Sequence, residues 1–359
     1  KNFSYEQMEE GLRFAHERGK KVYLTTNIIP HNEDLAGFAD YIDTVAELGI
    51  DAVIVADLGL FSFIRKRHPN LHIHISTQAN NTNYLSANAW HEMGAQRVVL
   101  ARELGLGEIA DIRANTPDSL EIEAFVHGAM CISYSGRCLL SNYLTGRDAN
   151  KGACAQPCRW NYALMEEKRP GEYIHVEEDE RGSFFFNSKD LCMIGHIPEL
   201  VKSGITSFKI EGRVKSEYYV ATVVKAYREE LDRYEKDPEG YRFDPESYNE
   251  VLKVSHRPYT TGFYFGKTDE NAQVYETSSY IRDYDIVGLV TGYDETTGIA
   301  TVEQRNKFSV GETIEVMRAN GDNIPVTVKR IVDEEGNDMP SAPHPKQVLY
   351  IDLGQPLAM

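Results

Sequence analysis

Apolar residues in the first two thirds of the chain fall into short runs that alternate with longer stretches of helical spacing. The runs occupy residues 20–27, 52–57, 71–76, 97–101, 120–127 and 207–211. The clearest helical stretches occupy residues 5–18, 35–48, 84–93 and 104–114. Strands that alternate with helices predict an α/β fold with a parallel sheet. Short apolar runs of this kind are typical of strands that are buried on both faces.

Most of these predicted strands are followed at once by polar residues, which are Asn27, Asp57, Thr77, Gln78, Arg102, His127, Glu211 and Arg213. A (β/α)8 barrel builds its active site from the C-terminal ends of many strands. An open, doubly wound sheet instead binds ligands at one switch point, and no G-x-G-x-x-G follows the first strand. We therefore predict a TIM-like (β/α)8 barrel, with an open or irregular barrel as the alternative.

The predicted barrel has six visible strand–helix units, and eight are needed for closure. We expect the two missing N-terminal units, roughly 60–80 residues at ordinary repeat lengths, to lie upstream. The rhythm breaks at 131–190, which we interpret as a cysteine-rich insertion with a hairpin around a turn at 168–171. A long helix is expected over 216–234.

The pattern of apolar and polar residues changes after residue 235. Residues 236–280 are polar and predict a linker with short helices. Short alternating strands separated by turn signals follow, which is typical of a small β-barrel. The predicted domains are therefore a barrel over 1–235 with its insertion, the linker, and an all-β domain over 281–359.

Charge and hydropathy narrow the function classes. The formal net charge of −17 argues against a protein coated in basic surface for nucleic acid, so an RNA partner must meet a local basic patch. No apolar run approaches the ~20 residues of a membrane helix. The N-terminal sequence KNFSYEQMEE lacks the order of a signal peptide. We expect a soluble cytoplasmic protein without a membrane partner.

The five cysteines all lie between residues 131 and 192. Six residues separate Cys131 from Cys138, fifteen separate Cys138 from Cys154, and three separate Cys154 from Cys158. Four thiolates can hold a 4Fe–4S cluster, whereas zinc favours shorter spacings in both pairs. Iron–sulfur, zinc, and buried or redox thiols all remain open from spacing alone. Cys192 is a possible alternate ligand, although its apolar surroundings predict a buried helical position.

The run EAFVHGAMCISYSGRCLLSNY at 123–143 resembles the signature of the collagenase-like peptidase family U32. The segments GRDANKGACAQPCRWNY, NSKDL and FKIEGRVKSEYYVATVVKAYR are similar to the branch of that family that modifies tRNA. This resemblance implies a barrel protein that hydroxylates the wobble uridine of tRNA to 5-hydroxyuridine, with prephenate as co-substrate. It also implies a 4Fe–4S cluster on Cys131, Cys138, Cys154 and Cys158, with zinc as the alternative metal.

Other residues carry the expected chemistry. The candidate catalytic residues are Arg137, Lys189, Glu211, Arg213 and His127. The candidate substrate-binding residues are Gln78, Arg102, Arg159, Lys209 and Tyr134. Arginine forks suit RNA phosphates or the two carboxylates of prephenate, and an aromatic ring can stack on a splayed base.

Two other functions stay open. A collagenase-like peptidase is conceivable through a pair of His127 and Cys131, although no H-E-x-x-H or G-x-S-x-G motif occurs. Members of the family sometimes occur as paired proteins. The chain is therefore also a candidate for a noncatalytic, tRNA-binding subunit of a modification complex.

Overall fold

The computed structural model describes residues 3–131, 133–135, 137–160, 164–165, 173–174, 188–213, 215–266 and 280–353. The chain divides into two compact units. The first comprises Lys1–Glu211 with Arg257–Ser279, and the second comprises Gly212–His256 with Tyr280–Met359. Within the described part of the chain, no helix is long and apolar enough to cross a membrane.

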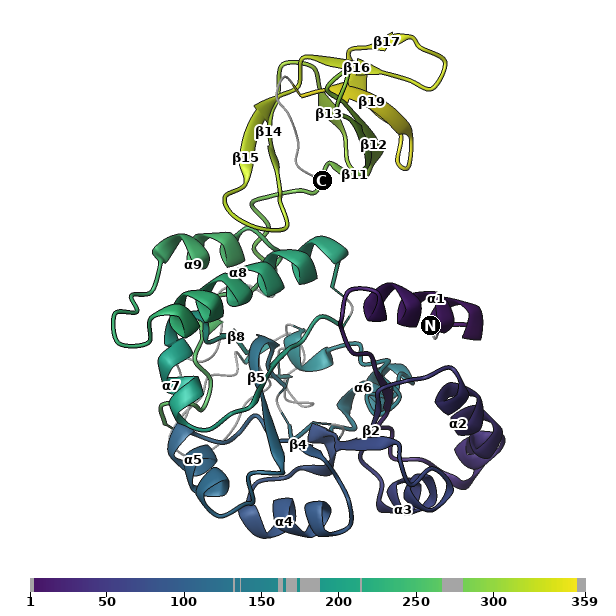
Figure 1. Cartoon of the computed structure of the whole chain (residues 1–359), viewed down its shortest axis with the longest axis vertical. Helices are drawn as coiled ribbons and strands as arrows, with labels where there is room; N and C mark the ends of the chain where they lie inside the picture. Colours follow the sequence, from purple (N-terminus) through teal and green to yellow (C-terminus); the bar gives the residue numbers. More distant parts are fainter. Residues whose placement is uncertain are drawn as a thin grey trace. The chain divides into compact units, whose positions relative to one another are not determined.

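The first unit is built on a parallel run of six strands (Figure 1). In spatial order they are β1 (Tyr23–Thr26), β2 (Ala52–Val55), β3 (His72–Ile75), β4 (Arg97–Val99), β5 (Glu121–Ala129) and β9 (Ser207–Ile210). Each coincides with one of the six predicted apolar runs, which confirms the parallel sheet. Among the described residues no pairing joins β9 back to β1, so the closed barrel stays a prediction.

Helices cover the outer side of these strands as an arc (Figure 1). They are α2 (Phe38–Glu47), α3 (Leu58–Arg67), α4 (Tyr84–Glu92), α5 (Leu106–Ala114) and α7 (Ile197–Lys202), and α1 (Tyr5–His16) precedes β1. Their buried faces include Ile42, Ile64 and Ile112. Asp57 accepts a hydrogen bond from the Leu60 amide at 2.9 Å. This polar residue after β2 therefore caps the N-terminus of α3.

Two further strands extend the sheet from β5. The last residues of β5, His127–Ala129, pair antiparallel with β8 (Asp190–Cys192), and β8 pairs in parallel with β10 (Tyr259–Thr260). The sequence predicted a helix around Cys192, and this interpretation was wrong. β10 lies in the stretch 236–280, which the sequence assigned to a linker with short helices. Strands of two or three residues have too few positions to show a period of two.

The insertion after β5 contains α6 (Leu140–Thr145), a single 3-10 turn at Pro157–Arg159, and a hairpin of β6 (Leu164–Met165) with β7 (Tyr173–Ile174). The hairpin confirms the predicted one, whose turn at 168–171 lies outside the described residues. Asn150 ties the insertion to the chain after β1. Its Oδ1 accepts from the Ile29 amide at 2.8 Å, and its Nδ2 donates to the Ile29 carbonyl at 3.0 Å.

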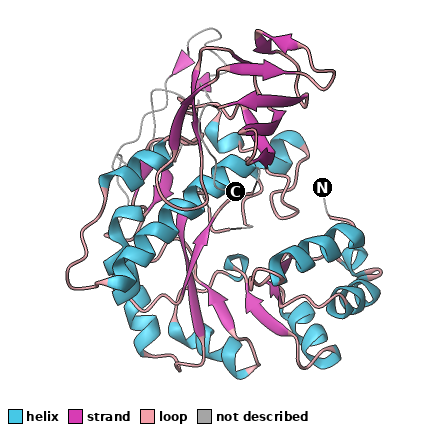
Figure 2. Ribbon diagram, turned by 45° about the horizontal axis from the view of Figure 1, so that its top comes forward, coloured by secondary structure: helices cyan, strands magenta, loops and turns pink. Residues whose placement is uncertain are grey.

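The second unit joins two helices to an all-β region. A five-stranded sheet contains β11 (Gly288–Asp294), β12 (Ile299–Gln304), β19 (Val348–Asp352), β16 (Arg330–Val332) and β17 (Asp338–Met339). Two-stranded pairs are formed by β13 (Phe308–Ser309) with β18 (Ser341–Ala342) and by β14 (Thr313–Val316) with β15 (Ile324–Thr327). The strands appear in magenta in Figure 2. The predicted all-β character is confirmed.

Helices α8 (Glu217–Lys236) and α9 (Pro245–Leu252) belong with these strands. Lys225 on α8 donates to the Gly321 carbonyl at 2.6 Å and to Asn323 Oδ1 at 2.8 Å. Lys253, which follows α9, pairs with Glu315 of β14 at 2.7 Å. The sequence placed the long helix at the end of the first domain, whereas these contacts group it with the second unit.

We predict that Phe308→Ala destabilises the second unit by about 3–5 kcal/mol, because Phe308 is a buried aromatic ring in that unit's core. Both tryptophans, Trp90 and Trp160, lie in the first unit. In denaturant unfolding, circular dichroism should therefore show a transition at a lower denaturant concentration than in the wild type. The transition followed by tryptophan fluorescence should keep its midpoint. Tyr350→Ala removes a half-exposed ring from the same unit and should have a much smaller effect. Equal shifts for both variants would contradict the prediction.

Candidate functional site

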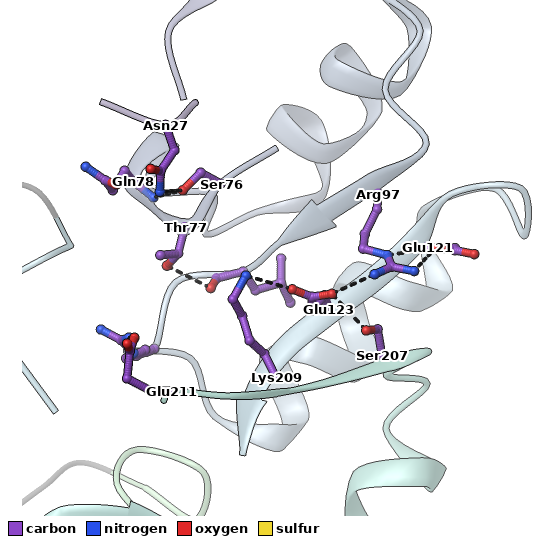
Figure 3. A network of polar contacts seen from close by, with 12 residues as sticks. Asn27, Ser76, Thr77, Gln78, Arg97, Glu121, Glu123, Ser207, Lys209 and Glu211 are labelled. Carbon is purple, nitrogen blue, oxygen red and sulfur yellow. Dashed lines mark hydrogen bonds and ion pairs between the residues drawn. The ribbon is translucent and has the colours of Figure 1, made fainter. Parts of the chain in front are cut away.

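A buried carboxylate in the middle of the sheet forms ion pairs with two basic side chains (Figure 3). Glu123 on β5 lies 2.8 Å from Arg97 Nη1 and 3.0 Å from Lys209 Nζ. Ser207 Oγ also donates to Glu123 at 2.8 Å. Burial raises the pKa of Glu123, but Lys209 and Arg97 outweigh this effect and hold the pKa below its ordinary value. Lys209, a predicted substrate-binding residue, therefore neutralises a buried charge in this structure.

Arg102 joins the sheet to the cysteine-rich insertion. Its guanidinium carbon lies 3.8 Å from the centroid of the Phe125 ring, a cation–π arrangement. One terminal nitrogen lies 3.0 Å from Glu211 Oε2, and the other donates to Ser135 Oγ at 3.2 Å. A single side chain thus connects the ends of β4 and β9, the ring on β5, and the loop that begins at Cys131.

Glu211 reaches this position because its neighbour on β5 is glycine. Gly128 has φ +120°, and a Cβ added there would lie 2.5 Å from the Cβ of Glu211. The Glu211 amide also donates to the His127 carbonyl at 2.9 Å. The sequence singled out Glu211, and the structure places it beside the predicted Arg102.

The loop that Arg102 contacts at Ser135 also lines an open hollow of about 410 Å³. Its lining residues are Asn80, Thr82, Ser133, Tyr134 and Arg137. Arg137 and Tyr134 were predicted from the sequence, and the structure brings them together. Asn80 was missed. It lies four residues past the end of the predicted strand 71–76, in a turn where it adopts the left-handed backbone (φ 54°) that asparagine tolerates, and its role depends on tertiary contacts.

All five cysteines carry thiols and none forms a disulfide. Cys131 is exposed, but desolvation by the surrounding chain raises its pKa, and the nearby Cys138 and Cys154 raise it further, whereas the Ser133 amide and Arg102 lower it. Three of the four predicted ligands thus act on one another electrostatically. Among the described residues, no three His, Cys, Asp or Glu side chains are close enough to hold a metal ion as they stand. As a donor set, four thiols on one insertion fit an iron–sulfur cluster or zinc.

Other predicted residues have different surroundings. Gln78 is buried, and its Nε2 lies 3.4 Å from Asn150 Oδ1. His127 is fully buried, with Nε2 3.4 Å from the Tyr259 hydroxyl. Because Gly128 approaches Glu211, strand alternation turns His127 to the opposite face. Gln78 therefore helps to anchor the insertion, and His127 lies in the core.

For the remaining predicted site residues, only their positions are described. Lys189 is half-buried, directly before β8. Cys192 is buried in β8, opposite His127. Arg213 is exposed and belongs to the second unit. The side chain of Arg159 lies outside the described part of the chain. The roles assigned to these residues stay predictions.

Comparisons with known proteins found matches over most of the chain. Residues 1–274 match the profile of peptidase family U32, and residues 282–359 match that of its C-terminal domain. The tRNA hydroxylation protein P1 of Bacillus subtilis (strain 168) is 40% identical over 353 residues, covering 98% of this chain and 83% of its own. The tRNA hydroxylation protein P of Escherichia coli (strain K12) is 38% identical, covering 99% and 86%. A Methanocaldococcus jannaschii protein named as an uncharacterized protease is 40% identical, covering 88% and 77%.

Two substitutions compare the contribution of a buried carboxylate to the free energy of unfolding with that of a half-exposed one. Glu123→Ala leaves Arg97 and Lys209 without their buried partner, so we expect a loss of about 3–5 kcal/mol in the free energy of unfolding. Glu121→Ala removes the half-exposed carboxylate that pairs with the same arginine and should cost less than about 1 kcal/mol. Denaturant unfolding at pH 7 measures both, and equal losses would contradict this assignment.

Because the pKa of Glu123 is lowered in the folded protein, the free energy of unfolding should depend on pH. The stabilisation is fully present above the unfolded-state pKa of about 4.3 and is lost as the pH falls through the lower folded-state value. The stability advantage of the wild type over Glu123→Gln should therefore shrink below pH ~4. An advantage that grows on acidification would contradict the ion-pair assignment.

Proposed function

This chain belongs to peptidase family U32, and we propose that it is an enzyme that hydroxylates a base of tRNA. Two relatives that align with nearly all of it are named tRNA hydroxylation proteins. The observation that carries the proposal is the position of the thiol-bearing loop. Arg102 bonds this loop to the strand ends, and the same loop lines a hollow with an arginine fork and an exposed tyrosine ring.

The specific reaction that we propose is conversion of the wobble uridine to 5-hydroxyuridine, with prephenate as co-substrate. C5 of a uracil is accessible only when the base is splayed out of a stack, as in a single-stranded loop. The open hollow is compatible with such a substrate. The chain's formal charge of −17 makes a local recognition site necessary, since a general basic surface is lacking.

We assign Cys131, Cys138, Cys154 and Cys158 as ligands of a 4Fe–4S cluster. Replacing the C5–H bond by C5–OH is a two-electron oxidation, so it needs an oxygen donor that is itself reduced by two electrons (U–H + R–OH gives U–OH + R–H), a role that we give to the hydroxyl-bearing co-substrate. A bound cluster would supply one-electron chemistry that side chains lack. Arg102 offers a positive charge near Cys131, which partly offsets the desolvation that raises the pKa of this thiol. Glu211 and Phe125 hold that guanidinium in place.

A peptidase is the second candidate, favoured by the family's description and by the name of the archaeal relative. A cysteine peptidase needs a histidine beside its nucleophile. His127 instead contacts Tyr259 in the core, and the groups that act on Cys131 include Arg102 and two other thiols. Cleavage of denatured collagen by metal-free, folded protein would favour this candidate over the hydroxylase.

Protein purified without oxygen should contain iron and acid-labile sulfide in equal amounts, about four of each per chain. Cys138→Ser should lose most of both. Cys192→Ser removes the buried thiol of β8 and should retain both. Zinc in place of iron, or the same loss in both variants, would contradict the cluster assignment.

The reaction itself is tested in a host that lacks its own tRNA hydroxylation protein. Mass spectrometry of tRNA nucleosides should detect 5-hydroxyuridine when this chain is produced, and its level should fall at least tenfold with Cys138→Ser. Full modification in that variant would contradict an essential cluster. Tight tRNA binding without any modification by the wild type would identify a noncatalytic subunit.

A further inference from the structure

The open hollow beside the thiol-bearing loop has the chemistry of a nucleotide site. It is lined by the side chains of Arg137 and Tyr134 from the loop, and by Asn80, Thr82 and Ser133. Arg137 is exposed, and Tyr134 is 45% exposed. A cation, two hydroxyl groups and an aromatic ring are thus presented to solvent in one place.

Asn80 fixes the orientation of Arg137. Its Oδ1 accepts a hydrogen bond from Arg137 Nε at 2.7 Å, and its Nδ2 donates to the Thr77 carbonyl at 3.3 Å. The amide is therefore held at both ends, between the turn after β3 and the guanidinium. In the part of the chain that the structure describes, no acceptor bonds the two terminal nitrogens of Arg137. Four N–H groups remain in a fixed fork, which matches the geometry of an oxyanion.

The neighbouring arginine differs from Arg137. The guanidinium of Arg102 is occupied by Glu211, Ser135 and the Phe125 ring. Its charge is balanced within the protein, whereas Arg137 pairs only with a neutral amide among the described residues. Of these two cations near the loop, Arg137 is therefore the one that retains an unbalanced charge for a ligand.

We propose that this hollow binds one nucleotide of single-stranded RNA, with the phosphate on the Arg137 fork and the base stacked on Tyr134. Ser133 and Thr82 supply further hydroxyl donors to the phosphate. The openness of the site suits a polymer that enters and leaves on both sides. The inference rests on the proposed function, because it assigns the place where the tRNA loop is anchored beside the thiols.

The experiment measures binding of a fluorescently labelled anticodon stem–loop RNA by anisotropy at several salt concentrations. Arg137→Ala should weaken binding about tenfold and lower the salt slope by about 0.7, the value for one phosphate contact on a single strand. Tyr134→Ala should also weaken binding about tenfold, and Tyr134→Phe should retain wild-type affinity because the ring remains. Asn80→Ala should weaken binding less than Arg137→Ala, because the fork keeps its charge but loses its orientation.

The matched control is Arg13→Ala, which removes an exposed positive charge from α1 in the same unit. If Arg137→Ala changes affinity and salt slope no more than Arg13→Ala does, the inference is overturned. Prephenate binding, measured by calorimetry, separates the two oxyanion sources. Loss of prephenate binding in Arg137→Ala with unchanged RNA binding would assign the hollow to a small dicarboxylate and would also overturn the inference.

The binding assay does not depend on catalysis, so the two proposals fail separately. If the chain forms no 5-hydroxyuridine but Arg137→Ala still weakens RNA binding, the nucleotide site stands and the hydroxylase does not. If hydroxylation occurs and Arg137→Ala binds RNA as the wild type does, only the nucleotide site falls. Circular dichroism of each variant confirms that the fold is retained.

Discussion

The guanidinium of Arg102 is the interaction on which the candidate site depends. It lies on the Phe125 ring, pairs with Glu211 and donates to Ser135, so four segments that are distant in the sequence share one contact. A lysine could not make this set of contacts, because it lacks the planar fork that stacks and bonds at the same time. The loop that begins at Cys131 therefore has a fixed starting point relative to the parallel strands.

A second group of charged side chains lies within the sheet, where its members neutralise one another. Glu123 balances Arg97 and Lys209, and all three belong to the sheet strands. Buried charges of this kind contribute little net stability, but each partner is costly to remove alone. Lys209 also lies 5.4 Å from the centroid of the Phe125 ring, so the ring that carries Arg102 is close to both groups of charged side chains.

The sequence predicted much of the fold because the six parallel strands are apolar and regularly spaced, and because the all-β region alternates with a period of two. It missed β8 and β10, which are too short to show a period. It located the long helix α8 within two residues, but not the strands that α8 packs with, because these are defined by contacts such as Lys225 with Gly321. For the site, residue types identified Arg102, Glu211, Tyr134 and Arg137. Asn80 and Asn150 were missed because their roles come only from tertiary contacts.

Under the proposed function, the acidic composition limits how an RNA could be bound. Affinity for nucleic acid ordinarily grows with the number of phosphates that are neutralised, and this chain carries a net charge of −17. Of the two arginines compared at the loop, Arg102 is already balanced by Glu211, and the oriented fork of Arg137 is the one left for the proposed phosphate. With so few ionic contacts, stacking on an exposed ring must supply a large share of the binding free energy. Such a site favours a loop whose bases are already unstacked, which is the same condition that hydroxylation of a ring carbon requires.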